Sequence, residues 1–188
     1  MNKYAALLLL IVSPTLVHAD GHGDPMVKES RAAIKAFAGE LKGNLQAAMK
    51  SGGPLKAIEV CKTVSPTITA EQSARQGLEI RRTSLKLRNP DNAPDDWERK
   101  ILASFEARKA LGEDVKKIDH HEQMEMDGKQ VFRYMKAIPT AEKPCTICHG
   151  SELAPELKAA LDKAYPKDQA RGFKAGDIRG AFSIIKPL

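Results

Sequence analysis

The chain has 188 residues, of which 42% are hydrophobic and 29% are charged, and this length suits a single globular domain. Its 30 Lys and Arg against 24 Asp and Glu give a net charge of +6, and the cations are scattered along the sequence rather than gathered in one patch. Scattered cations and the absence of a nucleic-acid-binding motif exclude a nucleic-acid partner, and the modest basic excess favours an acidic partner surface.

The first nineteen residues have the organisation of an export signal. Lys3 supplies a positive start, residues 5–16 are largely apolar, and Val17-His18-Ala19 offers a small-x-small cleavage site. Neither this apolar run nor any other approaches the ~20 residues of a membrane-spanning helix. We expect a signal peptide over 1–19, cleavage after Ala19, and a periplasmic or secreted protein without a stable membrane span. A retained N-terminal anchor is the alternative.

Three helices are predicted after a flexible leader of small and polar residues over 20–25. Apolar residues recur at steps of three or four from Ile34 to Leu45, as on one face of an amphipathic helix, and a Gly pair later interrupts the pattern. Ser65-Pro66 suits an N-cap followed by the first residue of a helix. The expected helices cover 26–50, 55–62 and 66–76.

The rest of the chain predicts strands and further helices. Residues 78–87 alternate imperfectly between apolar and polar side chains, which indicates a strand. Asp127-Gly128 suits the type I′ turn of a β-hairpin, and Asp95 or Asp96 suits a helix N-cap. The other expected elements are a turn at 89–94, a helix ending at Gly112, strands at 115–126 and 129–138, a helix at 153–165 and a strand at 177–185. This order predicts an α+β fold with an antiparallel sheet and flanking helices.

The run Cys145-Thr146-Ile147-Cys148-His149 is the Cys-x-x-Cys-His motif that marks attachment of a c-type haem. Two thiols three residues apart can each add to one of the two vinyl groups of a porphyrin, which forms two thioether bonds. His149 follows directly and falls beneath the iron, where an imidazole nitrogen serves as the proximal ligand. Export fits this interpretation because c-type haem is attached outside the cytoplasm. We expect one covalent haem c.

Two other interpretations use the same thiols. A thioredoxin-like dithiol opens a helix after a strand, whereas this motif follows a Pro-rich segment that makes a poor strand end. A zinc site would need four ligands and would leave His149 unexplained. Its ligands would be Cys61, Cys145, Cys148 and one of His120 and His121.

Cys61 follows Ile58 by three residues on the second expected helix, so it faces the same way as core residues. One interpretation is a buried structural cysteine that packs as a small hydrophobe. Once Cys145 and Cys148 are bound to haem, however, Cys61 is an unpaired thiol in an oxidising compartment, which calls for a role.

Three blocks of the sequence resemble one family, an exported haem domain long catalogued as a domain of unknown function. The blocks are CKTVSP at 61–66, IRRTSLKLRNPDNAPDDWE at 80–98 and CTICH at 145–149. The family occurs as small single-haem c-type cytochromes and as the outer sensor part of signalling proteins. The resemblance implies a PAS-like fold over 26–188 and haem ligation by the motif histidine and an opposite cysteine. Cys61 matches that cysteine, which assigns it to the distal side of the iron.

Thiolate ligation is chemically consistent with this assignment. The charge of a neighbouring metal lowers the pKa of a thiol enough to deprotonate it. Anionic sulfur favours Fe(III), so the potential should be lower than with a methionine ligand. By analogy with ordinary cytochromes, and with histidine as a further ligand type, the competing sixth ligands are Met124, Met126, Met135, His120 and His121.

Haem propionates need cations or hydrogen-bond donors, and four cations lie in or near the second family block. They are Arg81, Arg82, Lys86 and Arg88. Arg82 and Ser84 share a face of the expected strand, so we predict that these two contact the propionates. A solvated basic edge is the alternative.

The expected function is low-potential electron transfer to or from a redox partner protein. A haem-based redox or gas sensor is the alternative, because a Cys–iron bond that weakens on reduction could open a site for CO or NO and act through a separate partner. Enzyme chemistry is not expected, since a six-coordinate iron has no place for substrate and no distal acid–base pair is apparent.

Overall fold

The structure is a computed structural model, and it describes residues 24–188. The predicted signal peptide, its cleavage site and most of the predicted leader therefore lie outside the described residues. Asp24 and Pro25, the last two residues of that leader, form the start of a helix instead. The Asp24 side chain accepts a hydrogen bond from the backbone N of Met26 at 2.8 Å, which is an N-cap.

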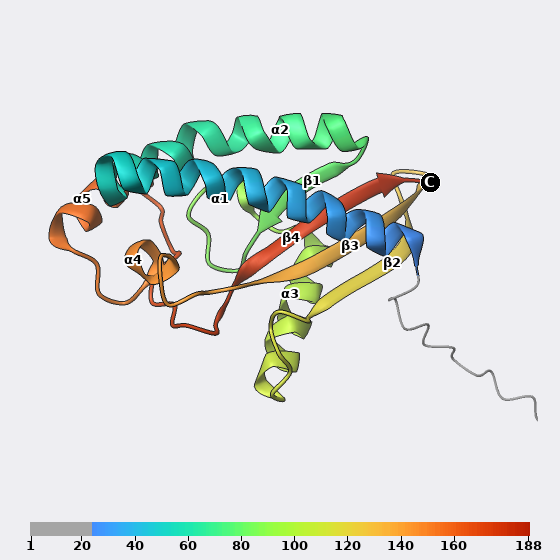
Figure 1. Cartoon of the computed structure of the whole chain (residues 1–188). Coiled ribbons are helices and arrows are strands. Elements are labelled where there is room, and N and C mark those ends of the chain that lie inside the picture. Colours follow the sequence, from blue (N-terminus) through green and yellow to red (C-terminus); the bar gives the residue numbers. More distant parts are fainter. Residues whose placement is uncertain (1–23) are drawn as a thin grey trace, which may run out of the picture.

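A four-stranded antiparallel sheet lies between two layers of helices (Figure 1), in the strand order β1-β4-β3-β2. The strands are β1 (Glu79–Thr83), β2 (Asp119–Met126), β3 (Lys129–Pro139) and β4 (Ile178–Pro187). The helices are α1 (Pro25–Glu59), α2 (Ser65–Gln76), α3 (Asp96–Ala110), α4 (Cys145–His149) and α5 (Pro155–Ala164). This confirms the predicted α+β fold with one antiparallel sheet and flanking helices.

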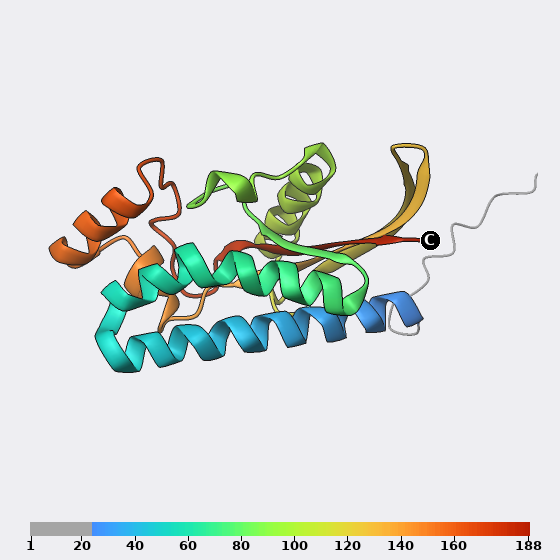
Figure 2. The same cartoon turned by 90° about the horizontal axis from the view of Figure 1, so that it is seen from above.

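Figure 2 shows the sheet edge-on, with α1 and α2 on one side and α3 on the other. Helices α4 and α5 lie beyond the end of the sheet that is far from the C-terminus. Within residues 24–188, none of the helices has both the length and the hydropathy that crossing a membrane requires.

A separate buried core lies between each helical layer and the sheet, because alternate residues of β3 point to opposite faces of the sheet. Tyr134 packs with Phe37 of α1, whereas Met135 packs with Phe105 of α3. A third cluster joins Ile58, near the end of α1, to the apolar face of α5, and Ile147 and Cys148 of α4 pack against it. The haem-attachment motif is thus held at one end of the molecule by core packing rather than by the sheet.

The first two predicted helices are joined within α1, and the predicted break is present as a distortion. Gly52 and Gly53 have non-helical φ angles of −159° and 67°. A π-helical turn, η1 (Val60–Val64), then leads directly into α2 and carries Cys61. The prediction of Ser65 as an N-cap is wrong, because Ser65 is itself helical and its hydroxyl accepts a hydrogen bond from Arg82 Nη2 instead.

Strand β1 is shorter than predicted. It ends at Thr83 because the Ser84 hydroxyl accepts a hydrogen bond from the backbone N of Lys86 at 3.1 Å, which turns the chain away from the sheet. Residues 90–92 then form a short 3₁₀ turn, η2 (Pro90–Asn92). The alternation on which the Arg82 and Ser84 prediction rested therefore ends between these two residues.

The hairpin and the third helix agree closely with prediction. Asp127 and Gly128 have φ angles of 52° and 74°, as a type I′ turn requires. Asp95 caps α3 with a complete capping box that includes Glu98. Strand β2 begins later than predicted, at Asp119, because the preceding residues form turns closed by the bond from Lys117 N to Asp114 O at 2.8 Å.

Gly180 allows β4 to pass close to the end of β1, and this contact yields a stability prediction. Its φ is 155°, and a Cβ there would lie 2.3 Å from the carbonyl oxygen of Thr83. We expect Gly180→Ala to lower the free energy of unfolding by about 1–3 kcal/mol, as measured by urea denaturation.

Gly39→Ala is the matched control for this prediction, because Gly39 is helical and a Cβ there meets nothing within 4 Å. It should stabilise the protein by about 0.5–1 kcal/mol. Equal changes in the free energy of unfolding for Gly180→Ala and Gly39→Ala would contradict the close approach of β4 to β1 at Gly180.

Candidate functional site

Helix α4 presents the Cys-x-x-Cys-His motif as a short helical turn. Residues three apart share a helix face, so Cys145 and Cys148 lie on the same side of α4. Both are free thiols, and Cys148 packs on the third core cluster while Cys145 lines a cavity. The spacing and the free thiols are what two thioether bonds to one porphyrin need.

His149 is held as a neutral imidazole. Its Nδ1 donates to the backbone carbonyl of Ala170 at 2.9 Å, which leaves Nε2 as the nitrogen with a lone pair. Burial, assisted by the positive charges of Arg179 and Arg88, lowers the pKa of His149 to about 3. A neutral ring whose other N–H is bonded to a carbonyl is the usual state of a metal-ligating histidine.

Arg179 lies against the His149 ring. Its Nε lies 3.2 Å from Nδ1 and 3.5 Å from Nε2, and because Nδ1 carries the proton, only the lone pair of Nε2 can accept a hydrogen bond from it. It also lies 5.2 Å from the centroid of Phe173 and donates to the Ser84 hydroxyl. Burial, together with the nearby Arg88 and Arg82, lowers the pKa of Arg179 to about 10.

Two adjoining cavities meet at His149. A cavity of about 260 Å³ contains Cys145 and apolar side chains of α1 and β4, including Leu41 and Phe182. A cavity of about 440 Å³ contains Cys61. Both are also lined by the same five residues, which are Arg82, Arg88, Asn92, His149 and Arg179. They form one divided cleft, which we call the His149 cleft.

Cys61 reaches the His149 cleft from η1. Cys61 is exposed to solvent, and it lines the larger half of the cleft. Burial raises the pKa of the Cys61 thiol, and the positive charges of Arg82, Arg88 and Arg179 act in the opposite direction. The structural alternative, a cysteine packed in the core, is not observed, since Cys61 belongs to none of the three buried clusters.

The other predicted iron ligands do not line the His149 cleft. Met135 is fully buried in the core against α3, and Met124 and Met126 lie on the edge strand β2. His120 contacts the Trp97 ring, and His121 contacts the Phe132 ring. The structure therefore does not bring His120 or His121 to the three cysteines, as the zinc interpretation requires. Among residues 24–188, no group of three or more His, Cys, Asp and Glu side chains is arranged to hold a metal ion.

Three of the four predicted propionate cations line the cleft, and Lys86 does not. Arg81 lines only the half that contains Cys61, and its guanidinium is engaged with the Ala93 carbonyl and with Glu98 at 3.8 Å. Lys86 donates to the Arg171 carbonyl and lies over the Phe173 ring. Arg82 and Arg88 line both halves of the cleft, and Arg88 is ion-paired with Asp168.

Arg82 and Arg179 line both halves of the cleft, and no ion pair joins either of them to a carboxylate among the described residues. Burial lowers the pKa of both. Arg179 was not predicted, because it lies far along the chain at the start of β4 and no local pattern marks it. Two enclosed cations without an anion suit a ligand that carries two carboxylates.

Ser84 lines the smaller cavity, but its hydroxyl is already bonded within the protein. It donates to the Arg179 carbonyl at 2.9 Å and accepts from the backbone N of Lys86 and from Arg179 Nη1. Ser84 thus holds Arg179 in place, and its contact with a propionate stays a prediction.

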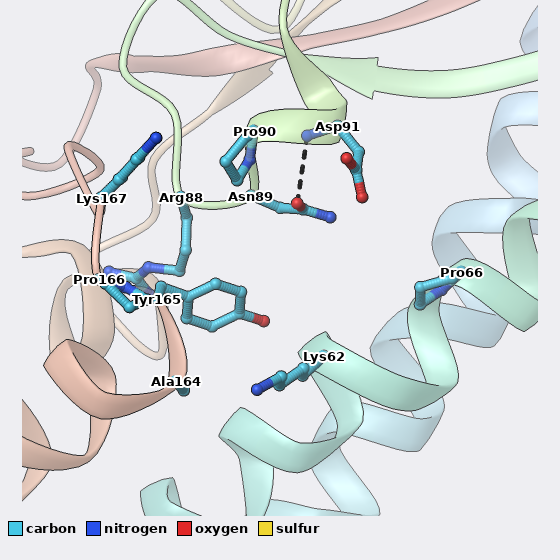
Figure 3. Close-up of a pocket in the computed structure, with 10 residues that line it drawn as sticks. All are labelled: Lys62, Pro66, Arg88, Asn89, Pro90, Asp91, Ala164, Tyr165, Pro166 and Lys167. Carbon is cyan, nitrogen blue, oxygen red and sulfur yellow. Dashed lines mark hydrogen bonds between the residues drawn. The ribbon is translucent and has the colours of Figure 1, made fainter.

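A third cavity, of about 430 Å³, adjoins the Cys61 side of the cleft (Figure 3). It lies between Lys62 of η1, the segment at 88–91 and the segment at 164–167, and Figure 3 shows the Tyr165 ring reaching across it. Burial, with the nearby Cys61, raises the pKa of Tyr165 to about 12, so its hydroxyl stays protonated at neutral pH. This cavity shares five lining residues with the half of the cleft that contains Cys61, which are Pro66, Arg88, Asn89, Asp91 and Tyr165.

Comparison with known proteins identifies a family and a common fold. A family model described as Tll0287-like matches residues 18–187. A crystal structure of the cyanobacterial haem protein Tll0287 superposes with a TM-score of 0.62 and 24% sequence identity, over 87% of this chain and 95% of that chain. At that identity the likeness shows a common fold. A search of the curated proteins found no match.

Proposed function

Because this chain belongs to the Tll0287-like family, we propose that it is an exported c-type cytochrome that carries electrons at low potential. Cys145 and Cys148 would attach one haem, and His149 and Cys61 would be its axial ligands. The observation that carries the proposal is the convergence of the motif and Cys61 on the His149 cleft. The likeness to a haem protein of the same fold supports it. So does the arrangement of helices on both faces of an antiparallel sheet, which suits the PAS-like fold that the resemblance implies.

The residues present fit a haem. His149 offers Nε2 because Nδ1 is bonded to Ala170, and Cys61 offers a thiol in the same cleft. Arg82 and Arg179 offer two positive charges for two propionates, which supports the prediction for Arg82 and adds Arg179. The apolar wall formed by Leu41, Leu45 and Phe182 suits the flat face of a porphyrin.

When bound, the haem supplies an iron that takes up and releases one electron. Cys61 would lower its potential, since an anionic sulfur stabilises the more positive iron. His149 would add a neutral nitrogen donor. The positive charge of the half-buried Arg179 would act against Cys61, because it favours the less positive state of the iron. The balance of these residues sets the potential, and an acidic redox partner fits the net charge of the chain.

The test is an absorption and EPR spectrum of the exported holoprotein beside a Cys61→Ala variant. We expect a low-spin signal and a sulfur-to-iron charge-transfer band in the unmodified protein, and loss of both features in the variant. Met135→Leu, which changes a buried methionine far from the cleft, should leave the spectrum unchanged. An unchanged Cys61→Ala spectrum would overturn cysteine ligation. Absence of haem after competent maturation would overturn the proposal as a whole.

A haem-based redox or gas sensor that acts through a separate partner is the second candidate function. The cavity in Figure 3 favours it, because Lys62, Tyr165 and the segment at 88–91 frame an opening to the Cys61 side of the cleft. Stopped-flow mixing of the reduced protein with CO tests this candidate. Rapid CO binding that displaces Cys61 would support it, and no CO binding would exclude sensing by this route.

A further inference from the structure

Arg88 and Asp168 form a buried ion pair behind the motif. The Arg88 side chain is 10% exposed and that of Asp168 is 1% exposed. Two parallel contacts join them, from Arg88 Nε to Oδ1 at 3.1 Å and from Nη2 to Oδ2 at 3.0 Å. The Nε contact is a hydrogen bond, and the Nη2 contact adds ion-pair attraction, so the guanidinium is held beside the carboxylate.

The same guanidinium donates hydrogen bonds to two backbone carbonyl groups near His149. Arg88 Nη2 donates to the carbonyl of Cys148 at 2.6 Å and to that of Ala170 at 3.1 Å. The Ala170 carbonyl is also the acceptor for His149 Nδ1. Arg88 therefore links the residue before His149 to the group that holds the His149 ring.

Asp168 holds the other side of this acceptor. Its Oδ1 accepts a hydrogen bond from the backbone N of Ala170 at 2.9 Å, so Ala170 is bonded to both members of the ion pair. The segment at 168–170 contains no helix or strand, and these bonds replace the rigidity that such an element would give. Figure 3 shows Arg88 extending from its loop to the segment that follows α5.

We propose that Arg88 and Asp168 are positioning residues for His149, which fix its tautomer and tune the potential of the haem iron that it binds. The effect on the potential rests on the proposed function, because it needs a bound haem. The effect on the tautomer needs only the protein. Hydrogen bonds behind a ligating histidine control both the orientation and the electron donation of its ring.

The two residues act on the potential with opposite sign. Arg88 adds a positive charge, which disfavours the oxidised iron. Asp168 adds a negative charge, which favours the oxidised iron. Removal of Arg88 should therefore lower the midpoint potential, and removal of the Asp168 charge should raise it.

Arg171 provides a matched control. Its Nε bonds the same Asp168 carboxylate at 2.9 Å, but its side chain contacts neither the Cys148 nor the Ala170 carbonyl. It is also paired with Asp162 and is 24% exposed, so solvent screens its charge. Arg171→Gln thus changes the charge around Asp168 without touching the acceptor of His149.

The experiment compares Arg88→Gln, Asp168→Asn and Arg171→Gln in the exported holoprotein by mediated optical redox titration. At a fixed potential, we expect Arg88→Gln to lower the ratio of reduced to oxidised protein about tenfold, which is 59 mV for one electron. Asp168→Asn should raise the ratio, and Arg171→Gln should keep it within about threefold of the unmodified protein. Arg88→Lys keeps the charge without the fork of donors and should recover part of the shift.

A second measurement needs no haem. The ring ¹⁵N shifts of His149 in a Cys145→Ala/Cys148→Ala background report its tautomer. We expect one tautomer with the proton on Nδ1, and a mixture after Arg88→Gln. Shifts of the same sign for Arg88→Gln and Asp168→Asn, or a tautomer unaffected by Arg88→Gln, would overturn the positioning role. Haem-free unmodified protein would instead overturn the proposed function and leave the tautomer test in force.

Discussion

Replacement of both Cys145 and Cys148 by alanine is expected to abolish covalent haem attachment completely. In the unmodified protein each thiol would add to one vinyl group, so haem should stay with the chain through denaturation and acid–acetone extraction. The double variant has no thioether-forming residue on α4, and its haem should be extracted fully. Intact-mass measurement and haem staining after denaturing electrophoresis check this result.

Single variants and Cys61→Ala are the controls. Cys145→Ala or Cys148→Ala should keep one thioether bond, with a shifted absorption maximum from the remaining vinyl group. Cys61→Ala should keep both bonds, because Cys61 lies on η1, outside the Cys-x-x-Cys-His motif of α4. Retention of covalent haem by the double variant would mean that Cys61 supplies an attachment bond. That outcome would overturn its assignment as the distal ligand.

Glu98→Ala is expected to lower the free energy of unfolding by about 3–5 kcal/mol, because it removes the buried one of the two carboxylates beside a buried arginine and also breaks the capping box of α3. Glu98 is completely buried, and Arg133 is 3% exposed and lies 3.6 Å from the Glu98 carboxylate. Arg133 also stacks 4.1 Å from the centroid of Trp97 and pairs with Asp95 at 2.8 Å. The same carboxylate completes the capping box of α3.

Glu113→Ala is the matched control for the buried pair. Glu113 contacts Arg108 at 2.6 Å, a shorter distance than that between Glu98 and Arg133, but both partners are about one-third exposed. Its loss should cost far less than the loss of Glu98, because solvent screens an exposed pair. The free energies of unfolding are measured by urea denaturation, with all variants in the same haem state. The double replacement Glu98→Leu/Arg133→Met should lower the free energy of unfolding by less than Glu98→Ala does. A larger decrease for the double variant would contradict the argument that a buried charge without its buried partner causes the loss.

Features that depend on neighbours in sequence were predicted well. The capping box at Asp95, the turn at Asp127-Gly128 and the end of α2 at Gly77 each follow from the conformations that a few adjacent residues prefer. The separation of Tyr134 from Met135 follows from strand alternation. The errors also have local causes, since hydroxyl groups made bonds that competed with the predicted pattern at Ser65 and Ser84.

By itself, the sequence determined the Cys-x-x-Cys-His motif, the α+β fold and the family resemblance that singled out Cys61. Only the tertiary structure placed Cys61 in the cleft of His149 and the competing methionines outside it. It alone brought Arg179 to the His149 ring and the Ala170 carbonyl to Nδ1. The reason is that spacing and periodicity act over one or two turns of chain, whereas Arg88 meets Cys148 and Ala170 across 60 and 82 residues. Such pairs are set by the packing of whole elements, here of α4 and α5 against the end of α1.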